Sequence, residues 1–513
     1  MSLAASETLK TSPDTVALAD ERQSFTWTAL DPVLNRATNA LLARDGTARI
    51  AVFAQNSAET VIAYLAALQA GVASVPVNFH LTVEELVHIL RDSGAGIVFA
   101  GPETVEVALA AAAAVGGLKV VAWRTAAKDG VTAWADWLAE ASAAEPPTDM
   151  PPKAHLHYTS GTTGTPKGVE TPPTMFLGGA DVAEFVQRLR AARALLGDRS
   201  PVLAVGPLYH TGPLSAVRQL AAGASVVVVS RFDPEAVLRA IETHRVKSTV
   251  MVPTHFQRLL SLPEDVRRRY DVSSLVAVSH TGAACPRDVK EKMITWFGPV
   301  LIEAYGATES GTTNSITSAE WLERPGSVGK TLAPFELLVI GENGEARGPG
   351  EIGQLYFRDT NGRGIVYHND AEKTRAAHLR PGVFTLGEIG YADAEGYVFI
   401  TDRVSDMIVS GGVNIYPAEV EAVLLDHPAV ADVAVIGAPN TEMGEEVKAL
   451  VVLRPAAVAN AGELEAFCRQ KLAGYKCPRS FEFVADIGRN AMGKINKRQL
   501  RRPYWPSERT IGG

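Results

Sequence analysis

Residues 158–169 read Tyr-Thr-Ser-Gly-Thr-Thr-Gly-Thr-Pro-Lys-Gly-Val, so three glycines, five small hydroxyl residues and one lysine fall within twelve positions. Gly161 and Gly164 let the backbone turn without a Cβ clash, and amide N–H groups and hydroxyls can then surround an anion. Lys167 adds a mobile positive charge at the far end. The hydroxyl side chains are those of Thr159, Ser160, Thr162 and Thr163. The pattern predicts a phosphate-binding loop that is entered from a strand near Leu156.

Two other interpretations of this loop fit its sequence less well. The nucleotide-kinase loop has Lys and then Ser or Thr directly after its second glycine, whereas Gly164 is followed by Thr-Pro-Lys-Gly. A flexible Gly/Thr linker is the default for such a composition, but a linker has no use for Pro166 and Lys167 between two glycines. The stretch instead resembles, almost letter for letter, the phosphate loop of the adenylate-forming superfamily, which contains acyl-CoA synthetases, carrier-protein-loading adenylation domains and firefly luciferases. The resemblance implies that residues 159–164 and Lys167 bind ATP.

The overall composition limits the class of protein. A chain of 513 residues is too long for one hydrophobic core, so we expect a large, subdivided domain and at least one smaller domain. The formal net charge of −8 argues against a nucleic-acid or anionic-membrane surface and favours small-molecule chemistry. Three cysteines without metal-type spacing predict packed thiols in a reducing cytoplasm. The N-terminus lacks a signal peptide, and polar residues interrupt the longest near-apolar window, residues 61–77, so we expect no membrane span.

Strand-like and helix-like segments alternate along much of the chain. Residues 50–54 and 72–77 are strand-like and flank an alanine-rich helical segment, and the rhythm returns over residues 202–297. Such alternation predicts parallel strands covered by helices, here as two doubly wound α/β subdomains. After Gly326, short β-like runs between turn residues predict a small β-barrel or antiparallel sheet. Residues 348–353 match a Gly-x-Gly-x-x-Gly dinucleotide fingerprint but lie between two short strands, which indicates a hairpin turn.

The tail of the chain has a pattern of its own, with a helix, two strands and a second helix after about residue 405. It predicts an autonomous α+β domain of about a hundred residues. The expected fold class is therefore α/β, with a large N-terminal adenylation domain over residues 1–404 that holds the ATP and acyl pockets. Residues 405–513 are expected to form a small, mobile C-terminal domain.

A second motif, Glu303-Ala-Tyr-Gly-Ala-Thr-Glu309, follows an apolar run that ends at Ile302, where sheets of this type expose ligand sites. Beside the phosphate loop it resembles the superfamily's second ATP motif. The resemblance implies that Tyr305 stacks on adenine, Thr308 contacts the α-phosphate and Glu309 holds Mg²⁺, for which a carboxylate is the usual protein ligand. Further ATP-site positions implied by the resemblance are Gly282, Ala283, Ala284, Gly306 and Ala307.

Two matches in the second half of the chain carry departures from the superfamily pattern. Residues 386–388, Leu-Gly-Glu, occupy the place of a Thr-Gly-Asp whose carboxylate binds both ribose hydroxyls, and Glu388 is one methylene longer than that Asp. The long match over residues 401–421 implies that Arg403 binds ribose and phosphates with its fixed fork of donors. Two positions later, Ser405 occupies the hinge, which is commonly Asp or Lys in the family.

The residues expected to contact coenzyme A lie in the predicted mobile domain. The resemblance implies that Gly411 and Gly412 form the loop that leaves a passage for the pantetheine arm. Position within a basic tail motif suggests further contacts from Tyr475, Lys476 and Arg479.

The closing motif over residues 490–500 resembles that of the family and implies that Lys494 is the catalytic lysine. An ammonium on a flexible stem after a glycine can reach both the substrate carboxylate and the α-phosphate. His210 matches a catalytic position beside the carboxylate and acyl pocket. The expected pocket residues are small, which indicates a bulky or alicyclic acid, and are Thr211, Gly212, Gly282, Gly311 and Thr312.

Together these motifs predict an ATP-dependent acyl-CoA synthetase that uses ATP, Mg²⁺ and coenzyme A. The acid is first converted to acyl-AMP with release of pyrophosphate, and the thiol of coenzyme A then attacks the adenylate. One alternative is a stand-alone adenylation enzyme that loads a carrier protein. The other is a non-catalytic nucleotide-binding relative, prompted by Leu386, Glu388 and Ser405. The expected partners are small molecules, and the oligomeric state stays open.

Overall fold

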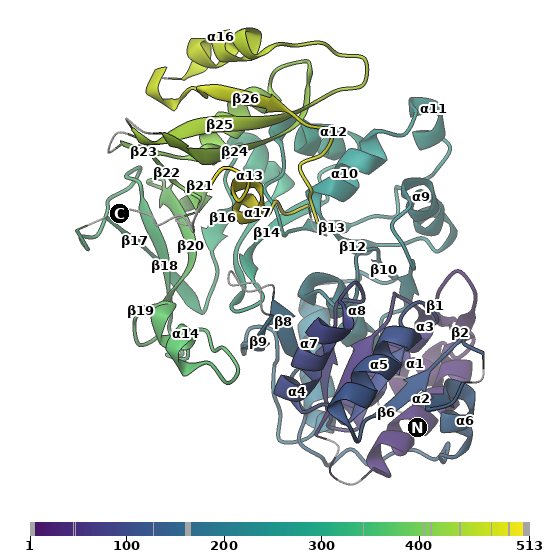
Figure 1. Ribbon diagram of the computed structural model, residues 1–513. Helices are drawn as coiled ribbons and strands as arrows, with labels where there is room; N and C mark the ends of the chain where they lie inside the picture. The colour runs from purple at the N-terminus through teal and green to yellow at the C-terminus, as the bar shows by residue number, and fades with distance from the viewer. Residues whose placement is uncertain are drawn as a thin grey trace. The chain divides into compact units, whose positions relative to one another are not determined.

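The computed structural model describes residues 6–44, 46, 48–126, 128–159, 166–341, 343–403, 406–410, 413–440, 443–472, 474–490 and 493–505. The chain divides into two compact units. Figure 1 labels their helices and strands. Unit 1 comprises Met1–Thr281, Glu291–Thr312 and Ile365–Ala377, and unit 2 comprises Gly282–Lys290, Thr313–Gly364 and His378–Gly513. In the described part of the chain, no helix is both long and apolar enough to cross a membrane.

Unit 1 contains a parallel sheet with the strand order β4-β3-β5-β6-β7. Its strands are β3 (Arg49–Phe53), β4 (Ala73–Pro76), β5 (Ile97–Ala100), β6 (Lys119–Ala122) and β7 (Val131–Ala133). The helices around it are α1 (Ser6–Thr11), α2 (Trp27–Leu42), α3 (Ala58–Gln69), α4 (Val83–Ser93), α5 (Val105–Val115) and α6 (Trp134–Ala139). Every residue of β4 and β5 is buried, as expected for parallel strands covered on both faces. The first doubly wound subdomain is therefore confirmed.

A second set of strands in unit 1 has the order β14-β13-β12-β10-β11-β1-β2, parallel from β14 to β1, with β2 antiparallel to β1. These are β1 (Val16–Ala19), β2 (Ser24–Thr26), β10 (Val202–Ala204), β11 (Val226–Val228), β12 (Ser248–Met251), β13 (Ala277–His280) and β14 (Leu301–Ala307). The helices between them are α7 (Val182–Leu195), α8 (Thr211–Ala221), α9 (Pro234–Thr243), α10 (Pro253–Leu260), α11 (Glu264–Arg267) and α12 (Arg287–Phe297). The prediction of a second doubly wound region is confirmed.

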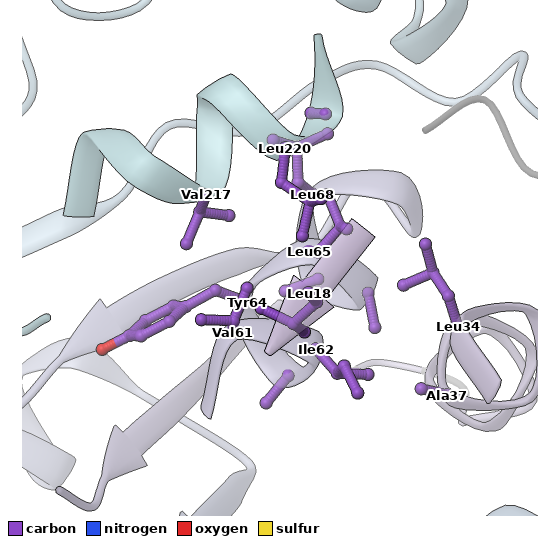
Figure 2. Close-up of a cluster of buried hydrophobic side chains, with 14 of the residues drawn as sticks. Leu18, Leu34, Ala37, Val61, Ile62, Tyr64, Leu65, Leu68, Val217 and Leu220 are labelled. Atoms are coloured by element: carbon purple, nitrogen blue, oxygen red, sulfur yellow. The ribbon is translucent and has the colours of Figure 1, made fainter. Parts of the chain in front are cut away.

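Helix α3 is buried along its whole length, from Ala58 to Gln69. It packs on β3 and β4 and also on α8, and Figure 2 shows Leu65 and Leu68 of α3 opposite Leu220 of α8. A helix that is covered on all sides has no solvent-facing stripe, which explains why its sequence is predominantly apolar. Ser57 caps it by accepting a hydrogen bond from the Thr60 N–H at 3.2 Å, a role for which serine is strongly preferred.

A separate hairpin carries the ends of the predicted phosphate loop. It consists of β8 (Leu156–Thr159) and β9 (Lys167–Glu170), which are antiparallel. Thr159 and Lys167 are opposite each other in the register, and residues 160–165 of the predicted phosphate loop lie outside the described residues.

Unit 2 contains antiparallel strands in the order β17-β18-β20-β21-β16-β15, with β19 paired to β20. They are β15 (Gly311–Thr317), β16 (Gly329–Thr331), β17 (Phe335–Ile340), β18 (Gly353–Asp359), β19 (His378–Arg380), β20 (Val383–Ala392) and β21 (Tyr397–Arg403). The short helix α13 (Ser318–Glu323) also belongs to unit 2, whereas α14 (Ala371–Ala376) lies in the segment Ile365–Ala377 of unit 1. Residues 348–352 form the last part of the connection between the antiparallel strands β17 and β18, and Gly353 begins β18, so the hairpin interpretation of the glycine pattern is confirmed.

The tail forms a second sheet of unit 2, with the order β23-β22-β25-β24 and β26 beside β25. Its strands are β22 (Ile408–Ser410), β23 (Val413–Ile415), β24 (Val430–Asn440), β25 (Gly444–Leu453) and β26 (Ser480–Phe483). Its helices are α15 (Pro417–Leu425), α16 (Ala461–Lys471), the 3₁₀ turn η1 (Gly474–Lys476) and α17 (Lys497–Arg501). Ile408, Val433 and Leu464 are among the residues of its own buried core, as the sequence predicts for an α+β tail.

Candidate active site

Sheet register places two of the predicted motifs at one edge of unit 1. His280 of β13 is opposite Glu303 of β14, and Val250 of β12 is opposite both Ala204 of β10 and Ser279 of β13. The carboxyl ends of these parallel strands therefore share an edge, where open α/β sheets bind their ligands. His210, which follows β10, and the motif that ends β14 both extend from this edge.

The carboxylate of Asp92, which belongs to none of the predicted motifs, anchors the β8–β9 hairpin. The Tyr158 hydroxyl donates to Asp92 Oδ2 at 2.6 Å, and the Asn369 amide donates to Asp92 Oδ1 at 3.2 Å. Burial and then the Asp92 carboxylate raise the pKa of Tyr158, so this hydroxyl stays protonated and remains a donor. Asp92 thus connects α4 to the strand that leads into the phosphate loop.

Residues 366–368 extend the hairpin as a third backbone segment beside β9. The Glu170 N–H donates to the Val366 carbonyl at 3.0 Å, and the His368 N–H donates to the Gly168 carbonyl at 2.9 Å. A Cβ on Gly168 would lie 2.9 Å from the Cβ of His368, so only glycine allows this approach. The segment therefore lies against the strand that carries Lys167.

This segment brings Lys167 and Glu309 into one network of charges. Lys167 Nζ lies 3.3 Å from Asp370 Oδ2, and the Tyr367 hydroxyl donates to Glu309 Oε1 at 3.2 Å. The ammonium of Lys373 lies 4.0 Å from the centre of the Tyr367 ring. Burial lowers the pKa of Lys373, nearby Lys167 lowers it further, and the Glu309 carboxylate opposes both. The predicted phosphate lysine and the predicted metal ligand therefore occupy the same charged neighbourhood.

The turn that carries Thr308 and Glu309 is tightly built. The Ser310 N–H donates to the Ala307 carbonyl and the Ala307 N–H donates to Ser310 Oγ, both at 3.3 Å. A Cβ on Gly306 would lie only 2.0 Å from the carbonyl oxygen of Gly311. Gly306 is thus required by the closeness of the two strands on either side of the turn.

The small residues expected around the acyl group have a second explanation in packing. Gly212 lies in the first turn of α8, and a Cβ there would lie 3.2 Å from Val250 Cγ1. Gly311 has φ of +75°, and a Cβ there would lie 2.7 Å from Thr174 Oγ1. Thr211 opens α8 after the N-cap His210, whose ring lies 4.3 Å from that of Tyr209. The glycines therefore allow close contacts, and their size alone does not define the shape of the acid.

Unit 2 holds the predicted ribose-binding residues on adjacent strands. Glu388 of β20 is opposite Arg403 of β21 in the antiparallel register, and the Glu388 side chain is buried. Gly387 has φ of +88°, and its N–H donates to Thr385 Oγ1 at 3.0 Å. The side chain of Arg403 lies outside the described residues. The predicted adenine-side residues Gly282, Ala283 and Ala284 also belong to unit 2, where Gly282 has φ of +91°.

Lys494 follows a turn that two other side chains hold in place. Its N–H donates to Asn490 Oδ1 at 3.0 Å, and Arg489 Nη1 donates to the Gly493 carbonyl at 2.8 Å. Arg489 is itself fixed by two bonds of 2.7 Å to the Asp432 carboxylate. The Lys494 side chain is exposed, so the turn presents the ammonium outward from the tail domain.

The predicted coenzyme A and hinge positions are only partly described. Ser405, Gly411 and Gly412 lie outside the described residues, as do residues 160–165 of the phosphate loop. Tyr475 and Arg479 are exposed. Lys476 Nζ lies 2.7 and 2.8 Å from the two oxygens of the Glu419 carboxylate, so an incoming anion would have to compete with that ion pair.

Four residues of these networks carry no signal in the sequence motifs. They are Asp92, Tyr367, Asp370 and Arg489. The first three act on partners more than fifty residues away in the chain, and a pattern of neighbouring residues cannot show such pairs. Arg489 lies directly before the closing motif, and this position was the only indication in the sequence that it contacts the turn before Lys494.

Comparison with known proteins identifies the class to which this fold and these motifs belong. A family model described as AMP-binding enzyme matches residues 5–364, and a model described as AMP-binding enzyme C-terminal domain matches residues 419–494. The chain therefore belongs to the AMP-binding enzyme family, and the resemblance to adenylate-forming enzymes is confirmed.

Relatives of known activity make the class more specific. The chain is 35% identical over 505 residues to a feruloyl-CoA synthase of Amycolatopsis sp., covering 96% of each protein. It is 34% identical over 512 residues to a 3-[(3aS,4S,7aS)-7a-methyl-1,5-dioxo-octahydro-1H-inden-4-yl]propanoyl:CoA ligase of Mycobacterium tuberculosis, covering 95% of this chain and 96% of the relative. The solved structure of o-succinylbenzoate CoA synthetase from Bacillus subtilis with its acyl-adenylate intermediate has 30% identity, covers 97% of both chains and gives a TM-score of 0.79. The protein is an AMP-forming acyl-CoA synthetase.

Proposed function

We propose that this synthetase activates a bulky carboxylic acid that carries a ring. The observation that supports this proposal is shared by the three relatives described above, whose names each specify an acid built on an aromatic or alicyclic ring. Because packing explains the small size of Gly212 and Gly311, the proposal rests on these relatives. A panel of acids in which acetate is the best substrate would contradict it.

In the first half-reaction, a carboxylate oxygen of the acid attacks the α-phosphorus of ATP. The bond from that phosphorus to the pyrophosphate oxygen breaks, which gives acyl-AMP and pyrophosphate. Lys167 and the loop of residues 159–164 hold the phosphates, while the ammonium of Lys494 stabilises the negative charge that develops at the reacting centre. Adenosine and the acid are held by Tyr305, Thr308, Glu388, Arg403 and His210.

Magnesium fits the donors around Glu309. In the part of the chain that the structure describes, no cluster of three or more His, Cys, Asp or Glu side chains could form an all-protein metal cage. Mg²⁺ typically uses one or two carboxylates, substrate phosphates and water, and Glu309 supplies such a carboxylate beside the predicted phosphate lysine. If it bound there, Mg²⁺ would neutralise part of the negative charge on the phosphates of ATP. Tyr367 orients the carboxylate by donating to Oε1.

The second half-reaction forms the thioester. The sulfur of coenzyme A attacks the carbonyl carbon of the acyl-AMP, the bond to the phosphate oxygen breaks, and AMP leaves. We propose that residues 405–513 rotate at Ser405 between the two steps, which removes Lys494 and brings in Gly411 and Gly412. The separate C-terminal family match over residues 419–494 supports a distinct domain in this part of the chain.

Acid-dependent exchange of labelled pyrophosphate into ATP tests the adenylation step. Mass spectrometry of the acyl-AMP formed from a mixed library of acids then identifies the preferred substrate. Incubation of the enzyme, ATP and that acid with either free coenzyme A or a carrier protein separates the synthetase from a carrier-loading enzyme. Absence of exchange with every acid would favour a non-catalytic nucleotide-binding protein.

A further inference from the structure

The charged network around Lys167 contains a second lysine that belongs to none of the predicted motifs. Lys373 of α14 is half-buried, and its ammonium lies 4.0 Å from the centre of the Tyr367 ring. In the described part of the chain, Lys373 forms no ion pair with a carboxylate. A cation that is held against an aromatic ring and has no anionic partner is available to an incoming anion.

Short-range hydrogen bonds fix the turn that leads into α14. Asp370 caps the helix by accepting from the Lys373 N–H at 2.9 Å, and Thr374 Oγ1 accepts from the Tyr367 N–H at 2.9 Å. Asn369 has φ of +53°, a left-handed conformation in which Asn is one of the more frequent residues. The position of the Lys373 backbone relative to Tyr367 is therefore set by local structure.

Asp370 and Glu309, the two carboxylates that act on Lys373, already have partners of their own. Lys167 Nζ lies 3.3 Å from Asp370 Oδ2, and the Tyr367 hydroxyl donates to Glu309 Oε1 at 3.2 Å. Lys373 covers a face of the same rigid ring whose hydroxyl contacts Glu309, so its ammonium lies near that carboxylate without pairing with it. Burial lowers the pKa of Lys373, and the nearest charges then act in opposite directions, Glu309 raising it and Lys167 lowering it. The four charged groups thus form one electrostatic unit.

The balance of charge in this unit suits a phosphate chain only if Lys373 takes part. Lys167 is already paired with Asp370, so by itself it offers phosphates little net positive charge. The terminal phosphates of ATP carry negative charge that one Mg²⁺ ion neutralises only in part. Lys373 supplies a further cation on a flexible stem, and a bound phosphate would favour the charged form of the amine.

We propose that Lys373, together with Lys167, binds the terminal phosphates of ATP and holds the pyrophosphate leaving group during adenylation. This inference rests on the proposed function, because it takes Lys167 to contact those phosphates. Lys373 acts only in the first half-reaction, since the thioester forms after pyrophosphate has left. Neither AMP nor acyl-AMP carries the phosphates that Lys373 contacts, so a comparison of ligands separates this role from a structural one.

Calorimetric titration of the full chain with ATP and with AMP, without acid, tests the proposal. Lys373→Met should weaken binding of ATP about tenfold or more and leave binding of AMP within about twofold of wild type, because only ATP loses a charge-assisted hydrogen bond. Lys373→Arg should keep part of the affinity for ATP. Methionine keeps a long side chain on the Tyr367 ring, so the melting temperature should be retained. Unchanged affinity for ATP, or equal weakening of ATP and AMP, would overturn the proposal.

A titration with ATP in the presence of EDTA separates a direct contact from an effect through Glu309. ATP then binds without magnesium, and the loss of affinity in Lys373→Met should persist. A loss that disappears in EDTA would show that Lys373 acts on the metal site by orienting Tyr367 and Glu309, and it would overturn the direct contact.

Lys330→Met is the matched control. Lys330 Nζ lies 4.6 Å from the centre of the Tyr397 ring, and the Tyr397 hydroxyl donates to Glu320 Oε1 at 3.2 Å. Unit 2 thus contains the same arrangement of Lys, Tyr and Glu in residues that belong to none of the predicted motifs. Lys330→Met should leave the affinities for ATP and AMP unchanged. If it weakened ATP binding as much as Lys373→Met, the position of Lys373 would not explain the result and the proposal would fail.

Inorganic pyrophosphate separates failure of this inference from failure of the proposed function. In pyrophosphate exchange, Lys373→Met should raise the KM for pyrophosphate about tenfold, whereas thioester formation from supplied acyl-AMP should stay within about twofold of wild type. The acyl-AMP is prepared from the acid that the exchange assay selects. Acid-dependent exchange with the same KM for pyrophosphate in both proteins would refute the role of Lys373 and leave the synthetase proposal intact. A wild-type protein that neither binds ATP nor catalyses exchange would refute both.

Discussion

Substitution of Gly306 by alanine tests whether the turn between β14 and β15 must be closely packed for adenylation. The added Cβ would lie 2.0 Å from the carbonyl oxygen of Gly311 and 2.9 Å from the Thr312 Cα. Carbon and oxygen atoms normally approach to no less than about 3.3 Å, so the carbonyl would have to retreat by roughly 1.3 Å. Both neighbouring atoms belong to the backbone, which means that no side-chain rotation can relieve the contact.

The structure allows an estimate of the size of this effect. Overpacking costs about 1–3 kcal/mol, and we expect the upper part of that range because backbone atoms must move. The displaced turn carries Thr308 and Glu309, and a misplacement of about 1 Å at a reacting centre can lower the rate by roughly 10²-fold. Gly306→Ala should therefore lower kcat/KM for ATP by about 10²-fold and also lower the melting temperature.

Two measurements on the same preparation decide the outcome. Pyrophosphate exchange gives kcat/KM for ATP, and differential scanning calorimetry gives the melting temperature. Gly462→Ala is the control, because Gly462 lies in the first turn of α16, where a Cβ would meet only Asn460 Oδ1 at an ordinary 3.4 Å. That variant should retain full activity, with stability unchanged or slightly raised. If Gly306→Ala kept its kcat/KM within twofold and its melting temperature, our account of this turn would be wrong.

Three further substitutions address other parts of the molecule. Lys494→Ala should abolish acid-dependent pyrophosphate exchange but spare thioester formation from supplied acyl-AMP, and equal loss in both assays would exclude the role assigned to this lysine. Tyr367→Phe removes the hydroxyl that donates to Glu309 at 3.2 Å. The substitution should raise the Mg²⁺ concentration needed for half-maximal pyrophosphate exchange about threefold or more. If this concentration did not change, the Tyr367 hydroxyl would not orient the Glu309 carboxylate for magnesium. Arg124→Met should destabilise the fold by about 3 kcal/mol, because Asp20, whose side chain is 1% exposed, loses the guanidinium at 2.6 Å. Burial raises the pKa of Asp20, but hydrogen bonds from the Ala58 N–H and Arg124 outweigh it and lower the pKa overall. In urea unfolding, the excess of the wild-type free energy of unfolding over that of Arg124→Met should therefore be complete above about pH 4. It should decline as the pH falls through the lowered pKa of Asp20 in the folded state. A difference between the two proteins that does not change from pH 2 to 7 would contradict this reasoning.

The sequence was most informative where a function depends on consecutive residues. The strand before the phosphate loop, the cap at Ser57 and the hairpin over residues 348–353 all follow from local backbone preferences and are found in the structure. The pairing of Lys167 with Asp370 could not be predicted in this way, because it depends on how a segment two hundred residues later lies against β9.

Glycine illustrates a second limit of sequence analysis. Gly212 and Gly311 suggested open space for a large acid, yet the structure places Val250 and Thr174 against them. A missing side chain has the same appearance in a sequence whether a ligand or another part of the chain fills its volume.

Residues 365–377 belong to unit 1 although the stretches on both sides of them in the chain belong to unit 2. A ribosome that has made residues 1–281 has therefore not yet supplied the last strand-like segment beside β9, nor Tyr367 and Asp370. Shortened proteins that end before residue 365 should keep much of the α/β scaffold. They would lack Asp370, which pairs with Lys167, and Tyr367, which donates to Glu309. The predicted nucleotide site is consequently completed late in synthesis, after most of the strands of unit 1 have already been translated.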